Sequence, residues 1–257
     1  MGRLSGKTIL ITGSTSGIGR DIAQACVLEG ANVIVHGRNK DAGEKVIRTL
    51  AQCGAGRAAF LQADIRHPEE CTRLVAQSEA IFGPLNGLVN NAGLFPRNSI
   101  EVENEEQFDE IFNVNVKGAF FCTQAALCSL RKNGGGSILN IGSTHAFGGE
   151  KGLAAYGISK GALLTMTYYL ARNYAREKIR ANWITVGWVL SEGERRRLAF
   201  EGFDETDALK RAEEVCPLGR IQTGEDIGLG AVFLLSDEAE MITGTVLEIT
   251  GGFKPLK

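Results

Sequence analysis

The chain has 257 residues, of which 44% are hydrophobic, and its formal net charge is −2. A charge this close to zero argues against a nucleic-acid-binding domain, which usually concentrates basic residues on one face. No apolar run is long enough for a membrane helix, and the first residues lead directly into a strand-like segment without the features of a signal peptide. Glycine is abundant, with 33 residues, and proline is scarce, with 5, so we expect an ordered fold with many tight turns.

Six cysteines are scattered along the chain, and none of them forms a CxxC pair. Such spacing is typical of reduced, buried thiols in a cytoplasmic protein rather than of a disulfide framework or a metal site. We therefore expect a cytoplasmic location and no bound metal.

Seven short apolar segments alternate with longer amphipathic stretches and are predicted to form strands. Several of them are apolar at consecutive positions, which is typical of parallel strands covered on both faces. The alternation of strand and helix implies right-handed crossovers. We predict a single α/β domain over residues 1–257, with a doubly wound, seven-stranded parallel sheet and about six main helices on its two faces. The predicted strands are residues 8–12, 32–36, 58–61, 87–90, 137–141, 181–185 and 245–249.

A charged segment separates the sixth predicted strand from the last helix. Residues 191–215 combine runs of acidic and basic side chains with a helix-prone composition. We expect residues 188–215 to form a mobile lid over the cleft at the carboxyl ends of the strands, where such sheets bind their ligands. The alternative is a pair of solvated surface helices with no role in binding.

A glycine-rich loop, from Thr12 to Gly19, joins the first predicted strand to the first predicted helix. Gly13, Gly17 and Gly19 allow the backbone to turn sharply and to approach a pyrophosphate closely. The start of the following helix supplies free N–H groups and the positive end of the helix dipole. Because a strand precedes the loop and a helix and second strand follow it, we predict a dinucleotide site rather than a purely structural turn.

The spacing of this loop, TGxxxGxG, resembles that of the classical short-chain dehydrogenase/reductase family. Further landmarks appear in the order and spacing of that family over essentially the whole chain. The resemblance implies a Rossmann fold, hydride transfer between a nicotinamide dinucleotide and an alcohol or carbonyl group, and a homotetramer. These landmarks are Asp64 with Ile65, Asn90 to Gly93, Asn115, Ser143, and Tyr156 with Lys160.

The resemblance also implies which residues bind the dinucleotide. In relatives, the residue at the position of Asp64 binds the adenine amino group; helix capping near Pro68 is the alternative for this carboxylate. The predicted cofactor residues are Gly13, Ser14, Thr15, Ser16, Gly17, Ile18, Gly19, Arg38, Asp64, Ile65, Asn91, Ala92, Gly93, Tyr156, Lys160, Gly187 and Val189.

The end of the second predicted strand indicates which dinucleotide is preferred. It reads His36-Gly37-Arg38-Asn39 and lacks the carboxylate that NAD-selective sites use to bind the ribose 2′-hydroxyl. Arg38 instead offers a fork of donors suited to a 2′-phosphate, and Ser14 and Thr15 are expected to add hydroxyl donors. We predict that NADP(H) is preferred and that NAD(H) is possible; the alternative for Arg38 is a surface arginine at a helix start.

Tyr156 and Lys160 are four residues apart on a predicted helix and therefore share a face. A nearby ammonium favours the phenolate, so Tyr156 is the predicted proton donor and acceptor. Ser143 is expected to polarise the substrate oxygen. The resemblance adds Asn115, which positions a water between Lys160 and solvent in relatives. Without the other landmarks, Tyr156 would be read as a packing residue.

Two positions depart from the family pattern. Val186 stands where relatives usually have proline, while Gly187 and Ser191 keep the glycine and hydroxyl positions. Valine restores an N–H and frees φ, so we expect a less rigid loop there. Thr250 stands where aspartate is common, and nothing in the sequence explains it.

The predicted substrate contacts, Ser143, His145, Phe95 and Trp188, combine polar and apolar groups. This mixture favours a sugar, a polyol or a sugar acid as the substrate. One alternative is a 3-oxoacyl-carrier-protein reductase, with a docking patch formed by Arg131, Lys132 and Arg172. The other is a catalytically silent NADP-binding sensor, which the complete set of catalytic residues opposes. The run Arg195–Arg197 faces either an anionic substrate or solvent.

Overall fold

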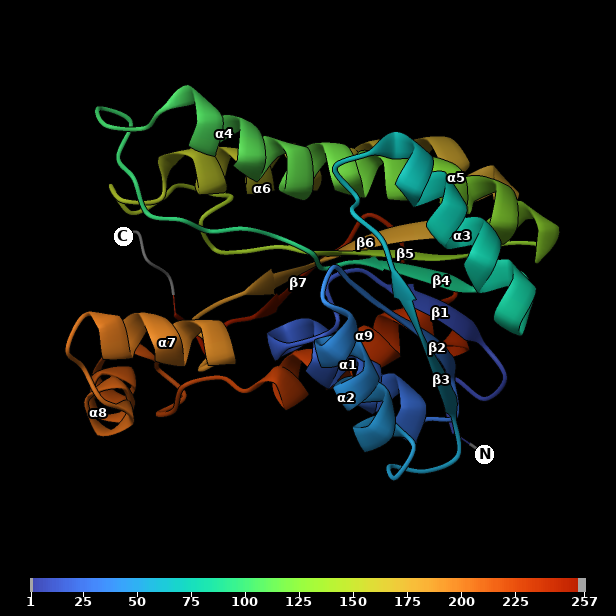
Figure 1. Cartoon of the computed structure of the whole chain (residues 1–257), viewed down its shortest axis with the longest axis horizontal. Coiled ribbons are helices and arrows are strands. Elements are labelled where there is room, and N and C mark those ends of the chain that lie inside the picture. Colours follow the sequence, from blue (N-terminus) through green and yellow to red (C-terminus); the bar gives the residue numbers. More distant parts are fainter. Residues whose placement is uncertain (1, 254–257) are drawn as a thin grey trace.

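The computed structural model describes residues 2–253, with only the backbone of Glu205. Seven parallel strands form one sheet in the order β3-β2-β1-β4-β5-β6-β7, and the predicted doubly wound α/β fold is confirmed (Figure 1). Each strand lies within two residues of its predicted bounds. The strands are β1 (Thr8–Ile11), β2 (Asn32–Gly37), β3 (Arg57–Gln62), β4 (Gly87–Asn90), β5 (Gly136–Ile141), β6 (Ile179–Val186) and β7 (Val246–Ile249).

Helices cover both faces of the sheet (Figure 1). One face carries α1 (Gly17–Leu28), α2 (Lys40–Leu50) and α9 (Gly224–Leu235). The other carries α3 (Pro68–Phe82), α4 (Glu105–Phe112), α5 (Ala119–Lys132) and α6 (Ala154–Tyr174), with a π-helical segment at Asn113–Gly118 between α4 and α5. Residues 191–215 form two further short helices, α7 (Glu192–Phe200) and α8 (Glu205–Val215), to the left in the figure. The described residues thus hold more helices than the six main ones predicted, and the additional helices α4, α7 and α8 are short.

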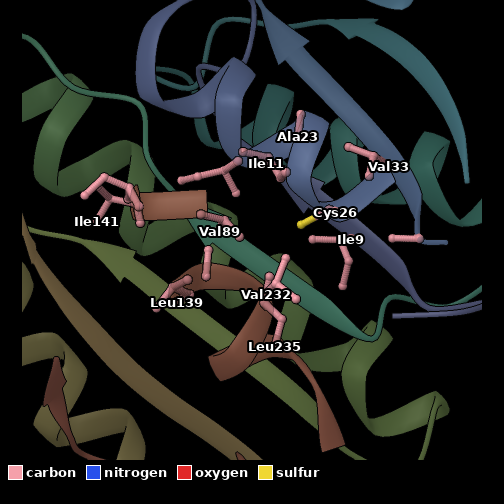
Figure 2. Packing of buried hydrophobic residues seen from close by; sticks show 14 of the residues in the cluster. Ile9, Ile11, Ala23, Cys26, Val33, Val89, Leu139, Ile141, Val232 and Leu235 are labelled. Atoms are coloured by element: carbon pink, nitrogen blue, oxygen red, sulfur yellow. The ribbon is translucent and has the colours of Figure 1, made fainter. Parts of the chain in front are cut away.

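The apolar strands fill two cores, one on each side of the sheet. Ile9, Leu10 and Ile11 are all fully buried. Successive side chains of a strand point to opposite faces of the sheet, and helices cover both faces. Ile9 and Ile11 join the core beneath α1 and α9, whereas Leu10 joins the core beneath α3 and α5. Figure 2 shows the first of these cores, in which Ile9 and Cys26 lie near Val232 and Leu235. Burying each such aliphatic side chain contributes about 1.5–3 kcal/mol.

The strand order changes direction at β1, which pairs with β2 on one side and with β4 on the other. In doubly wound sheets the loops diverge at this point and leave a crevice at the carboxyl ends of the strands. No helix in residues 2–253 is both long enough and apolar enough to cross a membrane.

Candidate active site

A cavity of about 1640 Å³ opens at the carboxyl ends of the strands. The loops that follow β1 to β6 line it, and residues of α7 and α8 line it as well. The predicted cofactor residues line this cavity with the exception of Ser14, and all four predicted substrate contacts do so as well. Asn115 lies behind the wall.

The glycine loop has no room for a side chain at Gly13 or Gly19. Gly13 has a φ of +64°, and a Cβ there would lie 2.8 Å from Cα of Ala92. A Cβ at Gly19 would lie 2.4 Å from Nδ2 of Asn91 and 2.5 Å from the carbonyl oxygen of Gly13. The side chain of Ser16, the N-cap of α1, makes no capping hydrogen bond, and the first turn of α1 has no acidic residue. The end of α1 therefore fits an anionic group such as a pyrophosphate.

Ser14 does not have the predicted role. Its side chain is fully buried; its Oγ donates to the carbonyl oxygen of Ile11 at 2.7 Å and accepts the N–H of His36 at 3.0 Å. The hydroxyl proton is used within the protein, so the expectation that this side chain supplies a phosphate donor is wrong. The sequence pattern gave no sign of these partners.

Thr12 is a structural residue of the site that the sequence-based prediction missed. Its Oγ1 accepts the N–H groups of Asn91 and Ala92 at 3.0 and 3.1 Å. In return, Nδ2 of Asn91 donates to the carbonyl oxygens of Thr12 and Gly13 at 2.9 and 3.0 Å. These bonds join the loops after β1 and β4. The threonine before the glycine loop was the only available signal.

Asp64 and Arg38 both line the cavity. Arg66 binds the carboxylate of Asp64 through two nitrogens, Nε at 3.0 Å and Nη2 at 2.6 Å, and this contact lowers the pKa of Asp64. The N-cap of α3 is His67, so Asp64 does not cap this helix. Arg66 is a partner that the sequence-based prediction missed.

Tyr156 and Lys160 occupy the first two turns of α6, beside the end of β5. Nζ of Lys160 donates to the carbonyl oxygen of Ile141 at 2.8 Å and lies 5.8 Å from the centre of the Tyr156 ring. Ser143 is 6% exposed, and its Oγ accepts the N–H of His145 at 3.2 Å. Because they are four residues apart on α6, Tyr156 and Lys160 both line the cavity, as Ser143 does.

Burial dominates the protonation of this group. It raises the pKa of the Tyr156 phenol, and the hydrogen bond with Ser143 lowers that pKa by a smaller amount. Burial also lowers the pKa of Lys160 to about 8, so its ammonium remains mostly charged at neutral pH. The sequence-based argument considered the ammonium alone. In the structure the desolvation of the phenol is the larger influence on Tyr156.

Asn115 lies in the π-helical segment and has its polar atoms bound. Its Oδ1 accepts the N–H of Leu94 at 2.7 Å, while its Nδ2 donates to the carbonyl oxygen of Leu94 at 2.9 Å and to Oγ of Ser159 at 3.0 Å. A Cβ at Gly93 would lie 3.4 Å from Oδ1 of Asn115 and 3.5 Å from Nζ of Lys160. Asn115 thus holds the loop after β4 close to Lys160.

Aromatic side chains surround the Tyr156 ring. The rings of Phe95 and His145 approach it edge-on, with centroids 6.2 and 6.1 Å away. Trp188 lines the cavity too, and its Nε1 donates to Oε1 of Glu194 at 2.7 Å. Arg197 binds the same carboxylate. Trp188 therefore connects the cavity wall to α7.

Residues 188–215 are placed where a lid is expected, since side chains from both α7 and α8 line the cavity. Of the arginine run, Arg196 and Arg197 line the cavity. Arg197 is already paired with Glu194 and Glu201. The mobility of this segment stays a prediction.

Val186 is the last residue of β6, and the lower rigidity expected for the loop after it stays a prediction. The strand β6 continues through this residue, whose carbonyl oxygen accepts the N–H of Thr144 at 3.1 Å. The next residue, Gly187, donates its N–H to the carbonyl oxygen of Ile249 at 3.3 Å. Both neighbouring segments therefore hold the chain at this point. Nothing in the structure explains Thr250 in place of aspartate.

The six cysteines are free thiols, and residues 2–253 contain no group of three or more His, Cys, Asp or Glu side chains arranged to hold a metal ion.

Comparisons with known proteins agree with this geometry. Residues 13–254 match a family model described as enoyl-(acyl carrier protein) reductase. The chain is 34% identical to an NADP-dependent (R)-specific alcohol dehydrogenase of Lentilactobacillus kefiri, over 98% of each chain. It is also 34% identical to a D-beta-hydroxybutyrate dehydrogenase of Cupriavidus necator, over 97% of this chain and 98% of the relative.

Among solved structures, a putative short-chain alcohol dehydrogenase from Sinorhizobium meliloti superposes with a TM-score of 0.89. It is 35% identical, and the match covers 97% of each chain. With this agreement over nearly the whole length, the chain belongs to the classical short-chain dehydrogenase/reductase family and is an oxidoreductase that acts on alcohol or carbonyl groups.

Proposed function

We propose that the protein transfers a hydride between NADP(H) and a carbonyl or secondary alcohol group of a sugar, a polyol or a sugar acid. The observation that carries this proposal is that Ser143, Tyr156 and Lys160 share one cavity with the glycine loop. A proton donor and an anion-binding helix end are the two elements that such a reaction needs from the protein.

Each catalytic side chain has a role that follows from its contacts. When bound, the nicotinamide supplies or accepts the hydride. The Tyr156 hydroxyl donates its proton to the substrate oxygen during reduction and takes it back during oxidation. Ser143, which lines the same cavity as Tyr156, binds the same substrate oxygen and orients it.

Lys160 stabilises the phenolate that remains after proton transfer. Its buried ammonium lies 5.8 Å from the centre of the Tyr156 ring. Its pKa of about 8 leaves it mostly charged at neutral pH. Desolvation makes the phenolate costly, so a positive charge at this place lowers its free energy. We propose that Asn115 acts through the Gly93–Leu94 loop and keeps open the path by which Lys160 exchanges protons with solvent.

The preference for NADP(H) is supported by the end of β2. Arg38 is exposed and lines the cavity, and its guanidinium makes no hydrogen bond or salt bridge within the described part of the chain. It is therefore available to bind a 2′-phosphate. The methyl and hydroxyl groups of Thr15 lie against Gly37, where a Cβ would meet them at 2.6–2.8 Å, so a side chain at Gly37 would not fit without a shift. A relative named as NADP-dependent agrees with this preference.

The substrate class is supported by the walls near Tyr156, where His145 and Arg97 add polar groups to the apolar surfaces of Phe95 and Trp188. The carrier-protein alternative loses support, because Arg131 is paired with Glu177 and Lys132 with Glu79. Two of the three cations proposed for docking therefore already have an acidic partner within the protein.

We further propose a cytoplasmic homotetramer. The free cysteines support the location. The assembly is supported by large apolar side chains that are about half exposed on α5 and α6, namely Phe120, Ile158 and Tyr169.

The reaction class is tested by turnover. With a panel of ketones, polyols, sugar acids and acyl thioesters, we expect the absorbance of the reduced cofactor to change with at least one carbonyl or polyol substrate. Tight binding of cofactor without any turnover across the panel would contradict the proposal and support the sensor.

Replacing the proton donor should abolish this turnover. We expect Tyr156→Phe to lower kcat by about 100-fold or more, because the substrate oxygen loses its proton source, while the Kd for NADP(H) and the Tm stay unchanged. Tyr168→Phe, an exposed position on the same helix, is the matched control and should behave as the unaltered protein. A Tyr156→Phe variant that keeps half of the original kcat would refute the mechanism.

Cofactor selectivity should depend on Arg38. We expect Arg38→Leu to lower kcat/KM for NADP(H) by about 10- to 100-fold, the size of a lost hydrogen-bonded charge, and to leave the value for NAD(H) unchanged. Arg48→Leu, at an exposed position on α2, is the control. Equal losses with both cofactors would contradict the assignment of Arg38 to the 2′-phosphate.

Light scattering tests the assembly. We expect a mass about four times the 27.6 kDa of the chain, and Ile158→Glu should reduce it, because a charge would then be buried in an apolar interface. A monomer at micromolar concentration would overturn this part of the proposal.

A further inference from the structure

His36 is a buried histidine that the proposed reaction does not use. It lies near the end of β2 and is 3% exposed. Its Nδ1 accepts the N–H of Gly13 at 3.1 Å, and its Nε2 lies 3.1 Å from the carbonyl oxygen of Ala63. Because a backbone N–H can only donate and a carbonyl can only accept, these two partners assign the ring proton to Nε2.

The main chain of His36 binds the same loop. Its carbonyl oxygen accepts the N–H of Ser14 at 2.9 Å, and its own N–H donates to Oγ of Ser14 at 3.0 Å. Main chain and side chain together therefore connect three loops, those that follow β1, β2 and β3. The N–H of Gly13 is directed to the imidazole, so it is not a donor to a phosphate.

The ring stays neutral in this environment. Burial lowers the pKa of His36 to about 4, so Nδ1 keeps its lone pair at physiological pH. A protonated ring would present a second donor to the Gly13 N–H and break the bond.

The position of the ring links it to the dinucleotide. His36, Gly13 and Ala63 line the cavity, and so do their neighbours Arg38 and Asp64. The bridge thus lies between the glycine loop and the residues proposed to bind the adenosine end of the cofactor.

We propose that His36 is a positioning residue for the dinucleotide: its neutral ring holds the glycine loop and the loop after β3 in the geometry that receives the adenosine phosphates. Loops that are ordered before the ligand arrives lose less freedom on binding, so affinity increases without any direct contact. This inference rests on the proposed function, because it assumes that the cavity binds NADP(H).

Two substitutions separate the two halves of the bridge. His36→Asn places an amide oxygen near the position of Nδ1, where it can accept the Gly13 N–H, and lacks the group that reaches Ala63. His36→Gln places an amide NH₂ near the position of Nε2 and leaves the Gly13 N–H without its acceptor. His67→Gln, at an exposed histidine outside the cavity, controls for the change of residue type.

The Kd for NADPH, measured by its fluorescence on binding, is the main readout. We expect His36→Gln to raise this Kd about 3- to 10-fold, as for the loss of one neutral hydrogen bond. His36→Asn, which keeps an acceptor for the Gly13 N–H and loses only the contact with Ala63, should raise the Kd by less than His36→Gln does. In both variants kcat at saturating cofactor should stay unchanged, because the reacting atoms are not touched.

A purely structural role would give a different pattern. The two variants would then lose Tm in the absence of cofactor to the same extent, with equal Kd values, and that result would overturn the inference. If His36→Gln fails to fold, ¹⁵N NMR of the unaltered protein still decides. A neutral His36 ring protonated at Nε2 at pH 7 supports the inference, and a charged ring or the Nδ1-protonated tautomer refutes it.

The failure of this inference is distinguishable from failure of the proposed function. If the unaltered protein binds neither NADPH nor NADH, the proposed function is wrong and the inference falls with it. If the unaltered protein binds NADPH and both variants bind it equally well, only the role of His36 is refuted.

Discussion

The site depends on the hydrogen bonds that join the loops after β1 and β4. Thr12 and Asn91 exchange bonds across the point where the strand order changes direction. The divergence of the loops there opens the crevice, but it does not by itself set the distance between its walls. Asn91 also holds the carbonyl oxygen of Gly13 and packs where a side chain at Gly19 would lie. The glycine loop is therefore shaped by its partners as well as by its own flexibility.

A second constraint comes from burial at the catalytic wall. Removing Tyr156 and Lys160 from water disfavours the charged form of each, which raises one pKa and lowers the other. The two pKa values, which are nearly equal for such groups in water, are therefore moved apart, and the phenol holds its proton more tightly than the ammonium does. The same desolvation makes the position of the ammonium matter, since a charge acts more strongly where water is excluded.

Much of the site could be predicted from the sequence because its spacing is local. A strand followed by a glycine turn and a helix start defines the anion-binding loop, and four residues of helix bring Tyr156 and Lys160 to one face. Side-chain pairings that are set by the conformation of the loops could not be predicted in this way, even where the partners are close in sequence. Arg66 donates hydrogen bonds to the carboxylate of Asp64, and the indole of Trp188 donates to Glu194. The hydroxyl of Ser14 donates to the carbonyl oxygen of Ile11 and accepts the N–H of His36. Each of these depends on how loops meet or turn, and no periodicity records that.

By itself the sequence determined the layered α/β fold, because runs of apolar residues at consecutive positions must be buried on both faces of a sheet. It also predicted the chemistry, since helical spacing together with the other landmarks of the family indicates Tyr156 as the proton donor and Lys160 as its cation. Only the tertiary structure decided which polar groups are free to meet a ligand. Gly13, His36 and Ala63 come from three different strand ends, and their hydrogen bonds exist only after β1, β2 and β3 pair in register. A donor already bound within the protein cannot also bind a cofactor, and that competition is settled by packing.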